Sequence, residues 1–284
     1  MYNVVFENDN GKKYYFGTNN GTVFDMDLSS GISVDLGTSQ GFSQIGETVE
    51  TQTVDGRTIS VNGVLYGNIP ARKRVMRNVL APFSSGTLVF EDKYYTRVFV
   101  KDAPTFSMVG NNGKFSMRFF APYPFFYSKD GEEVINIGAE IIPMFHFPIN
   151  YATPHQFGRR ETRGKVNVYN GGDIKVPFSL NISSLGTSTD VTLSNLLTFK
   201  QLKINGAINV GEEMHIYRDE NGILRCTMTR DGITSDAISR IDESSTLFDL
   251  DVGDNFLSVT DAELSENLDV ILTFKPAVVS LYEY

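Results

Sequence analysis

Apolar and polar residues alternate over nine positions from Ile174 to Ile182. A period of two indicates a half-buried β-strand, because successive side chains of a strand point to opposite faces of its sheet. Pro177 interrupts this strand and lacks a backbone N–H, so we expect the strand to lie at a sheet edge or to carry a bulge. The same alternation recurs along the chain, which predicts a mainly β protein. It is found at Ile59/Val61, Phe115/Met117/Phe119, Leu224/Cys226/Met228 and Leu268/Val270/Leu272/Phe274.

Three short turn sequences separate the expected strands. Asn221-Gly222 lies between two such strands, and Asn-Gly favours a primed hairpin turn because both of its residues accept positive φ. Asp55-Gly56 and Asn112-Gly113 are interpreted in the same way.

One helix is expected, at about residues 69–81. Asn68 can cap it, Pro70 suits its first turn, and Pro82 ends it. Apolar residues recur along it at spacings of three and four. Its other face carries four basic residues, which form either a solvated surface or a docking surface for an acidic partner or a neighbouring copy. These residues are Arg72, Lys73, Arg74 and Arg77.

A chain of 284 residues is long enough for two domains. The boundary is expected after residues 122–127, where the chain becomes polar. We therefore predict an N-terminal β domain at 1–128, a connector at 129–150 and a C-terminal β domain at 151–284. Each domain is large enough for a β-sandwich-type core, and the first would also contain a β-hairpin and the short helix.

Composition excludes several classes of protein. A single cysteine, Cys226, rules out an intrachain disulfide, and no apolar run is long enough to span a membrane. The N-terminus lacks a secretory pattern, so a soluble protein that is not conventionally secreted is expected. A net charge of -9 argues against nucleic-acid binding. The surplus is local: residues 242–269 contain nine carboxylates and no Lys or Arg, and we expect this edge to be solvated or to meet a basic partner.

No catalytic, cofactor or metal motif is present in the sequence. His146, His155 and His215 lack metal-ligand spacing, and Cys226 alternates with core residues, which predicts an inert buried thiol. Paired carboxylates for glycoside hydrolysis meet in space and not in sequence, so a β-rich hydrolase stays open as an alternative. Three acidic residues near the C-terminus favour a solvated turn over a calcium loop, and they offer a partner surface on the second domain. They are Asp249, Asp251 and Asp254.

The order of several short segments resembles the distal tail proteins (the Dit family) of siphophages, the bacteriophages with long, non-contractile tails. In the N-terminal half these segments are Asp55-Gly56-Arg57-Thr58-Ile59-Ser60-Val61-Asn62-Gly63, Leu80-Ala81-Pro82-Phe83, Gly86, Pro104-Thr105-Phe106 and Ala121-Pro122-Tyr123-Pro124-Phe125-Phe126. In the C-terminal half they are Val168-Tyr169-Asn170-Gly171-Gly172-Asp173, Lys203-Ile204-Asn205, Gly211-Glu212-Glu213, Gly253-Asp254-Asn255 and the run 268–276.

This resemblance implies a structural hub of the tail tip that catalyses no reaction and holds no cofactor. Members of the family form a ring, commonly a hexamer, between the tail tube protein and the tail-associated baseplate protein. Their galectin-like C-terminal domain faces outward, where receptor-binding or side-fibre proteins dock. The resemblance implies a virion protein made in the host cytoplasm, and the four basic helix residues are expected near a protomer contact. The alternative is a carbohydrate-binding module for adhesion to the host cell wall, although the chain lacks Trp.

Overall fold

The computed structural model describes residues 3–17, 21–28, 32–144, 158–219, 222–262 and 266–281. Strands dominate these residues, which confirms the mainly β prediction. The chain divides into two compact units: unit 1 contains Met1–Asp130 and Val278–Tyr284, and unit 2 contains Gly131–Ala277. Within the described ranges, no helix is long and apolar enough to cross a membrane.

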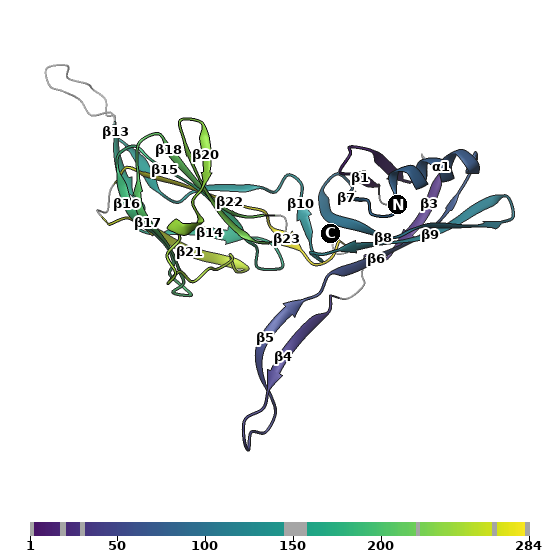
Figure 1. Ribbon diagram of the computed structural model, residues 1–284, viewed down its shortest axis with the longest axis horizontal. Coiled ribbons are helices and arrows are strands. Elements are labelled where there is room, and N and C mark those ends of the chain that lie inside the picture. Colours follow the sequence, from purple (N-terminus) through teal and green to yellow (C-terminus); the bar gives the residue numbers. More distant parts are fainter. Residues whose placement is uncertain are drawn as a thin grey trace. The chain divides into compact units, whose positions relative to one another are not determined.

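Unit 1 is built on one nine-stranded sheet (Figure 1). Seven strands follow the order β2-β1-β7-β8-β9-β6-β3; off this path, β10 pairs with β8, and β23 pairs with β10. Their bounds are β1 Val4–Asn8, β2 Lys13–Phe16, β3 Thr22–Met26, β6 Arg57–Leu65, β7 Ser85–Phe90, β8 Tyr94–Val109, β9 Asn112–Ala121, β10 Phe126–Ser128 and β23 Ala277–Val278.

The sheet of unit 1 curls until its two ends meet. Phe16 in β2 and Phe24 in β3 belong to opposite ends of the strand order, yet their ring centroids are 5.5 Å apart. Phe6 and Phe119 are likewise 5.3 Å apart, although β7 and β8 separate their strands. Neighbouring strands of a flat sheet are about 4.8 Å apart, so flat strands could not bring these rings together. One curled sheet therefore encloses the apolar core.

The expected helix is α1, Ile69–Val79, and it covers this core. The Asn68 side chain caps its start by accepting a hydrogen bond from the N–H of Ala71 at 3.2 Å. Met76 and Val79 are buried within the core cluster. The Leu80 N–H donates to the carbonyl of Met76 at 2.9 Å, so the helix ends before Pro82.

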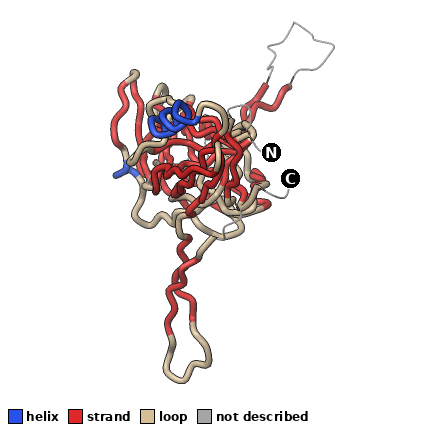
Figure 2. Tube along the Cα trace, turned by 90° about the vertical axis from the view of Figure 1, so that its right-hand side faces the viewer, coloured by secondary structure: helices blue, strands red, loops and turns tan. Residues whose placement is uncertain are grey.

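Strands β4 (Val34–Ser39) and β5 (Thr48–Val54) form a two-stranded sheet of their own in unit 1 (Figure 2). Every residue from 33 to 55 is exposed. A lone two-stranded hairpin is marginally stable in water. Because residues 33–55 are exposed, packing against the rest of unit 1 does not account for the stability of this hairpin.

The end of the described chain returns to unit 1. Val278 and Leu281 pack against the core of unit 1, and Val279 accepts a hydrogen bond from Arg57 Nη2 at 2.9 Å. The structure thus places the last residues with the N-terminal unit, whereas the sequence suggested one C-terminal domain at 151–284. Part of the expected connector at 129–150 consists of strands of unit 2, namely β11 Glu133–Asn136 and β12 Ala139–Pro143. Contacts between segments so far apart in the chain leave no pattern in the local sequence from which they could be predicted.

Unit 2 is a sandwich of two antiparallel sheets. Leu202 from one sheet and Ile216 from the other line the same internal space, so the buried faces oppose each other. The six-stranded sheet has the order β11-β22-β15-β18-β19-β20, with β15 Phe178–Ser184, β18 Glu212–Arg218, β19 Leu224–Arg230, β20 Ile233–Asp236 and β22 Leu268–Phe274. The four-stranded sheet has the order β14-β21-β16-β17, with β14 Val166–Asn170, β16 Ser188–Asn195, β17 Gln201–Ile208 and β21 Gly253–Thr260. A third pair joins β12 to β13 (Gly158–Thr162), and the 3-10 helix η2 spans Ile238–Arg240.

The predicted edge or bulge position of the strand containing Pro177 is wrong. Strand β15 begins at Phe178, directly after Pro177, and it pairs with β22 on one side and β18 on the other. The proline therefore precedes the ladder, while Val176 forms an isolated bridge to Leu250.

The turn predictions had mixed outcomes. Asp55-Gly56 does not join a hairpin, because β5 pairs with β4 and β6 pairs with β3 and β9. The hairpin expected at Asn112-Gly113 is present, but its turn lies two residues earlier, at Gly110 with φ 59°. The β18–β19 hairpin is confirmed with Gly222 at φ 75°, while Asn221 lies outside the described residues.

A strained turn between β16 and β17 allows a first prediction. Phe199 has φ 58° and is 85% exposed, so its ring gains no burial for a backbone conformation that a bulky residue rarely adopts. We expect Phe199→Gly to stabilise unit 2 by about 1 kcal/mol in urea unfolding, because glycine accepts positive φ without that penalty. Leu197→Gly in the same turn is the control, since Leu197 is not among the positive-φ residues, and it should not stabilise. A loss of stability with Phe199→Gly would contradict this account.

Candidate functional site

Two of the four expected interface residues, Lys73 and Arg77, lie over the same ring on one flank of α1, and Arg74 stands one helical turn before Arg77. The Lys73 ammonium and the Arg77 guanidinium lie 5.3 and 5.0 Å from the ring centroid of Phe106 in β8. Lys73 Nζ also lies 3.8 Å from the sulfur of Met108, and Arg74 is exposed. We call Lys73, Arg74, Arg77, Phe106 and Met108 the basic surface. It combines cationic groups with apolar side chains, as docking surfaces commonly do.

Arg72 lies elsewhere. A Cβ built on Gly21 would be 2.4 Å from its Cζ, so the guanidinium fills the space that this glycine leaves. Burial raises the pKa of the neighbouring Tyr14, and a hydrogen bond to Thr22 and the charge of Arg72 oppose that shift. The four basic residues predicted as one interface therefore divide, with Arg72 beside Gly21 and with Lys73 and Arg77 beside Phe106.

The β4–β5 hairpin has one apolar face, which sequence reasoning did not identify. The register pairs Val34 with Val54, and after a bulge it pairs Thr38 with Val49, so these valines and Leu36 share a face. At the tip, Phe42 and Ile45 are fully exposed. Residues 32–56 contain four acidic residues and no Lys or Arg, and this charge segregation was the available sequence signal. The four are Asp35, Glu47, Glu50 and Asp55.

The three acidic residues proposed as a partner surface of the second domain do not converge on one point. Asp249 forms an ion pair with Arg218 at 3.1 Å. Asp254 accepts a hydrogen bond from Asn167 at 2.7 Å, and the Asp251 side chain is exposed. Among the described residues, no group of three or more His, Cys, Asp or Glu could hold a metal ion.

The wider acidic segment is likewise not a uniform edge. The Asp242 carboxylate accepts hydrogen bonds from Ser244 and Asn205, which lower its pKa to about 2. Asp269 forms an ion pair with Arg160 at 2.7 Å, and Asp261 is buried. Glu263 lies outside the described residues.

The remaining titratable candidates are the single cysteine and the three histidines. Cys226 is 1% exposed, and burial raises the pKa of its thiol to about 11, so it is protonated and inaccessible at neutral pH. His215 is exposed on β18 and stacks on Tyr217 with ring centroids 4.5 Å apart. His146 and His155 lie outside the described residues.

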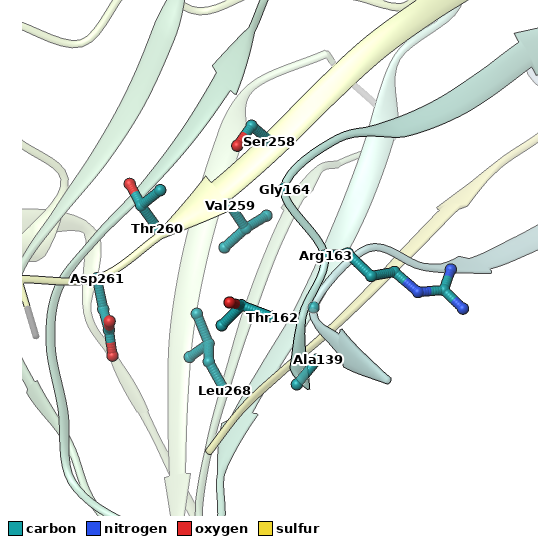
Figure 3. A pocket seen from close by; sticks show the side chains of 10 residues that line it. Ala139, Thr162, Arg163, Gly164, Ser258, Val259, Thr260, Asp261 and Leu268 are labelled. Atoms are coloured by element: carbon teal, nitrogen blue, oxygen red, sulfur yellow. The ribbon is translucent and has the colours of Figure 1, made fainter. Parts of the chain in front are cut away.

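Unit 2 contains a cavity of about 210 Å³ beside β12, β13 and β21 (Figure 3). Thr162, Ser258, Thr260 and Asp261 supply its polar groups, and the rest of its lining is aliphatic or glycine except for Arg163. Arg163 forms an ion pair with Glu140 at 2.8 Å. Among the described residues no aromatic ring lines the cavity, so these residues supply no platform of the kind on which sugars usually stack.

Comparison with known proteins gives similarity at the level of structure alone. No known family profile matches the chain, and neither does any curated protein sequence. The Dit protein (gp 19.1) of phage SPP1, described as a paradigm of the hub adsorption apparatus of phages that infect Gram-positive bacteria, is similar with a TM-score of 0.67. The two sequences are 13% identical, and the similarity covers 98% of this chain and 99% of that one.

Two further similar chains come from the phage P2 baseplate in its activated conformation. The calcium form gives a TM-score of 0.47 at 12% identity, covering 99% of this chain and 100% of that one. The strontium form gives 0.43 at 11% identity, with coverage of 96% and 98%. The fold of this chain thus matches that of a Dit-like phage tail protein, as the sequence resemblance suggested.

Proposed function

We propose that this protein is a structural hub of a bacteriophage tail tip and catalyses no reaction. In this role, copies form a ring, a hexamer by analogy with the family, at the distal end of the tail tube. The observation that carries the proposal is the similarity of nearly the whole chain to the SPP1 Dit hub protein. The ring joins the tail tube protein to the tail-associated baseplate protein, and unit 2 serves as the galectin-like domain on which receptor-binding or side-fibre proteins dock.

The surfaces of unit 1 suit a ring-forming protein. A closed ring of identical copies needs two different, complementary surfaces on each copy, because each contact is head to tail. Unit 1 offers a projecting acidic hairpin and a separate basic surface. Six weak contacts acting together give a stability that a single contact does not.

Immunogold electron microscopy tests the hub role. Antibodies raised against the purified full chain should label intact phage particles at the distal end of the tail tube. Label on the head or along the tube, or a chain missing from purified particles, would overturn the proposal. A glycan array probed with the same chain tests the alternative of a carbohydrate-binding module, for which the exposed His215 ring, stacked on Tyr217, and the exposed Tyr169 ring offer stacking surfaces.

A further inference from the structure

We propose that the cavity of unit 2 binds a small primary amine in its ammonium form, with the positive group beside the Asp261 carboxylate. This cavity is the space of about 210 Å³ next to β12, β13 and β21 (Figure 3). It has room for several waters or for an organic molecule of a few carbon atoms. The inference adds a ligand to unit 2 and does not rest on the hub role.

Asp261 supplies the negative charge of the cavity. It directly follows β21 and is only 7% exposed. Removing a carboxylate from water is strongly unfavourable unless hydrogen bonds or an opposite charge compensate. An ionised carboxylate accepts about four hydrogen bonds, so it can bond within the protein and still accept from a ligand. An ammonium group offers a positive charge and three donors, and it therefore complements this carboxylate.

The aliphatic lining of the cavity suits the hydrocarbon part of an amine. Ala139, Val259 and Leu268 line the cavity and are 4%, 7% and 4% exposed. In Figure 3 the side chains of Val259, Leu268 and Thr162 point toward one another. A short alkyl chain placed among them would leave water for an apolar surface, which is favourable. The Thr162 hydroxyl offers one further hydrogen bond to the polar end of the ligand.

Arg163 is the other charged residue among the described lining residues, and its charge is compensated outside the cavity. Its Nη2 forms the ion pair with Glu140 at 2.8 Å, and its Nη1 donates to the carbonyl of Asn136 at 3.1 Å. Figure 3 shows its side chain pointing away from Val259 and Leu268. A ligand in the cavity is therefore exposed mainly to the negative charge of Asp261, which favours a cation over an anion.

An organic cation fits this site better than a metal ion. Calcium takes six to eight oxygen ligands and magnesium six, commonly from several carboxylates. The cavity offers one carboxylate, and no group of three or more His, Cys, Asp or Glu that could hold a metal occurs in the described part of the chain. An ammonium ion needs fewer partners, because its three donors and its alkyl chain can be satisfied separately.

The cavity is accessible along the end of β13. Thr162 and Gly164 line it and are both exposed. A Cβ built on Gly164 would meet none of the described atoms within 4 Å, so there is open space on this side. A small amine can enter here without displacing a strand.

An NMR titration of the full chain tests the site with three probes of equal length: n-butylammonium, 1-butanol and butyrate. Salt at about 150 mM screens the exposed carboxylates. We expect n-butylammonium to shift the amide resonances of residues 162–164, 259–261 and 268. Its affinity should be at least about tenfold above that of 1-butanol, because only the ammonium forms a charged hydrogen bond with Asp261. Butyrate should not shift these resonances.

Asp261→Asn keeps the shape of the side chain and removes its charge. We expect it to weaken n-butylammonium binding about tenfold and to leave 1-butanol unaffected. Asp254→Asn, at an exposed carboxylate of the same strand, is the control and should bind like the wild type. The comparison of the three probes in the wild type is decisive even if Asp261→Asn does not fold.

Four results would overturn the inference. They are equal affinity for n-butylammonium and 1-butanol, preference for butyrate, unchanged amine binding by Asp261→Asn, and no shift at the cavity residues with any probe. The last result would mean that the cavity holds water alone. Labelling of the tail tip does not depend on any of them, so the hub role stands or fails separately.

Discussion

Arg57→Ala is expected to destabilise unit 1 by about 3 kcal/mol and to release the C-terminal segment. Arg57 is 4% exposed, and its guanidinium donates to the carbonyl of Leu28 at 3.4 Å and to that of Val279 at 2.9 Å. The same group lies 5.1 Å from the ring centroid of Phe126. Hydrogen bonds from a charged donor contribute about 1.5–3 kcal/mol each. The variant loses these bonds, but it no longer pays the cost of removing a charged guanidinium from water, which offsets part of the loss.

The release follows from the position of Val279, which lies in the segment that returns to unit 1. Limited proteolysis should therefore cut the variant after residue 277 faster than the wild type, and urea unfolding should show the loss of stability. Arg57→Met keeps much of the volume without the donors, so its loss should be intermediate. Arg118→Ala, an exposed arginine paired with Asp102, is the control and should change stability by less than about 0.5 kcal/mol. If Arg57→Ala behaves like this control, Arg57 does not hold the segment.

The features predicted correctly from the sequence are those with a local cause. Strand β9 alternates Phe115, Met117 and Phe119 inward, and α1 begins where Asn68 can cap it. The sheet curl that joins Phe16 to Phe24 has no such cause, because it depends on seven strands taken together. The return of residues 278–281 to unit 1 is missed for the same reason. Alternation continues through Pro177 and so predicts a strand there, although the ladder starts one residue later.

For the candidate surfaces, too, features with a local cause could be predicted from the sequence, and features that depend on distant contacts could not. The basic residues of α1 can be found by counting charges along the sequence. That Arg72 lies beside Gly21 whereas Lys73 lies beside Phe106 depends on the fold, so the sequence alone does not show it. Asp249 is close to Asp251 and Asp254 in sequence, yet its partner Arg218 comes from the distant strand β18. The exposure of the β4–β5 hairpin could not be predicted, because its Thr, Gln and Val residues are compatible with a buried or an exposed strand.

Gly86→Ala is expected to be as damaging to unit 1 as the loss of Arg57. Gly86 pairs with Asn8 in the ladder between β7 and β1. A Cβ at this position would lie 2.1 Å from the carbonyl oxygen of Glu7 and 2.7 Å from Cα of Asn8, well inside van der Waals contact. Both atoms belong to the backbone, so a side-chain rotation cannot relieve the clash, and β1 must move away from β7.

The displaced end of β1 carries further structure with it. The Asn8 side chain is buried and accepts hydrogen bonds from the N–H groups of Asn10 and Lys12 at 3.1 and 2.8 Å, which shape the turn into β2. We therefore expect a loss of about 3 kcal/mol, at the upper end for overpacked sites. Hydrogen exchange should rise in β1, β2 and β7 and remain at the wild-type rate in unit 2.

Gly164→Ala is the matched control for Gly86→Ala. A Cβ at Gly164 would meet no atom within 4 Å, and its φ is not positive, so alanine should be neutral or slightly stabilising there because it restricts the unfolded chain. A difference between the two variants isolates the close approach of β7 to β1 from the general effect of replacing a glycine. Equal stabilities would mean that β1 yields without cost. β1 would then be loosely held between β2 and β7, and the core between Phe6 and Phe119 would have to depend on the other strands.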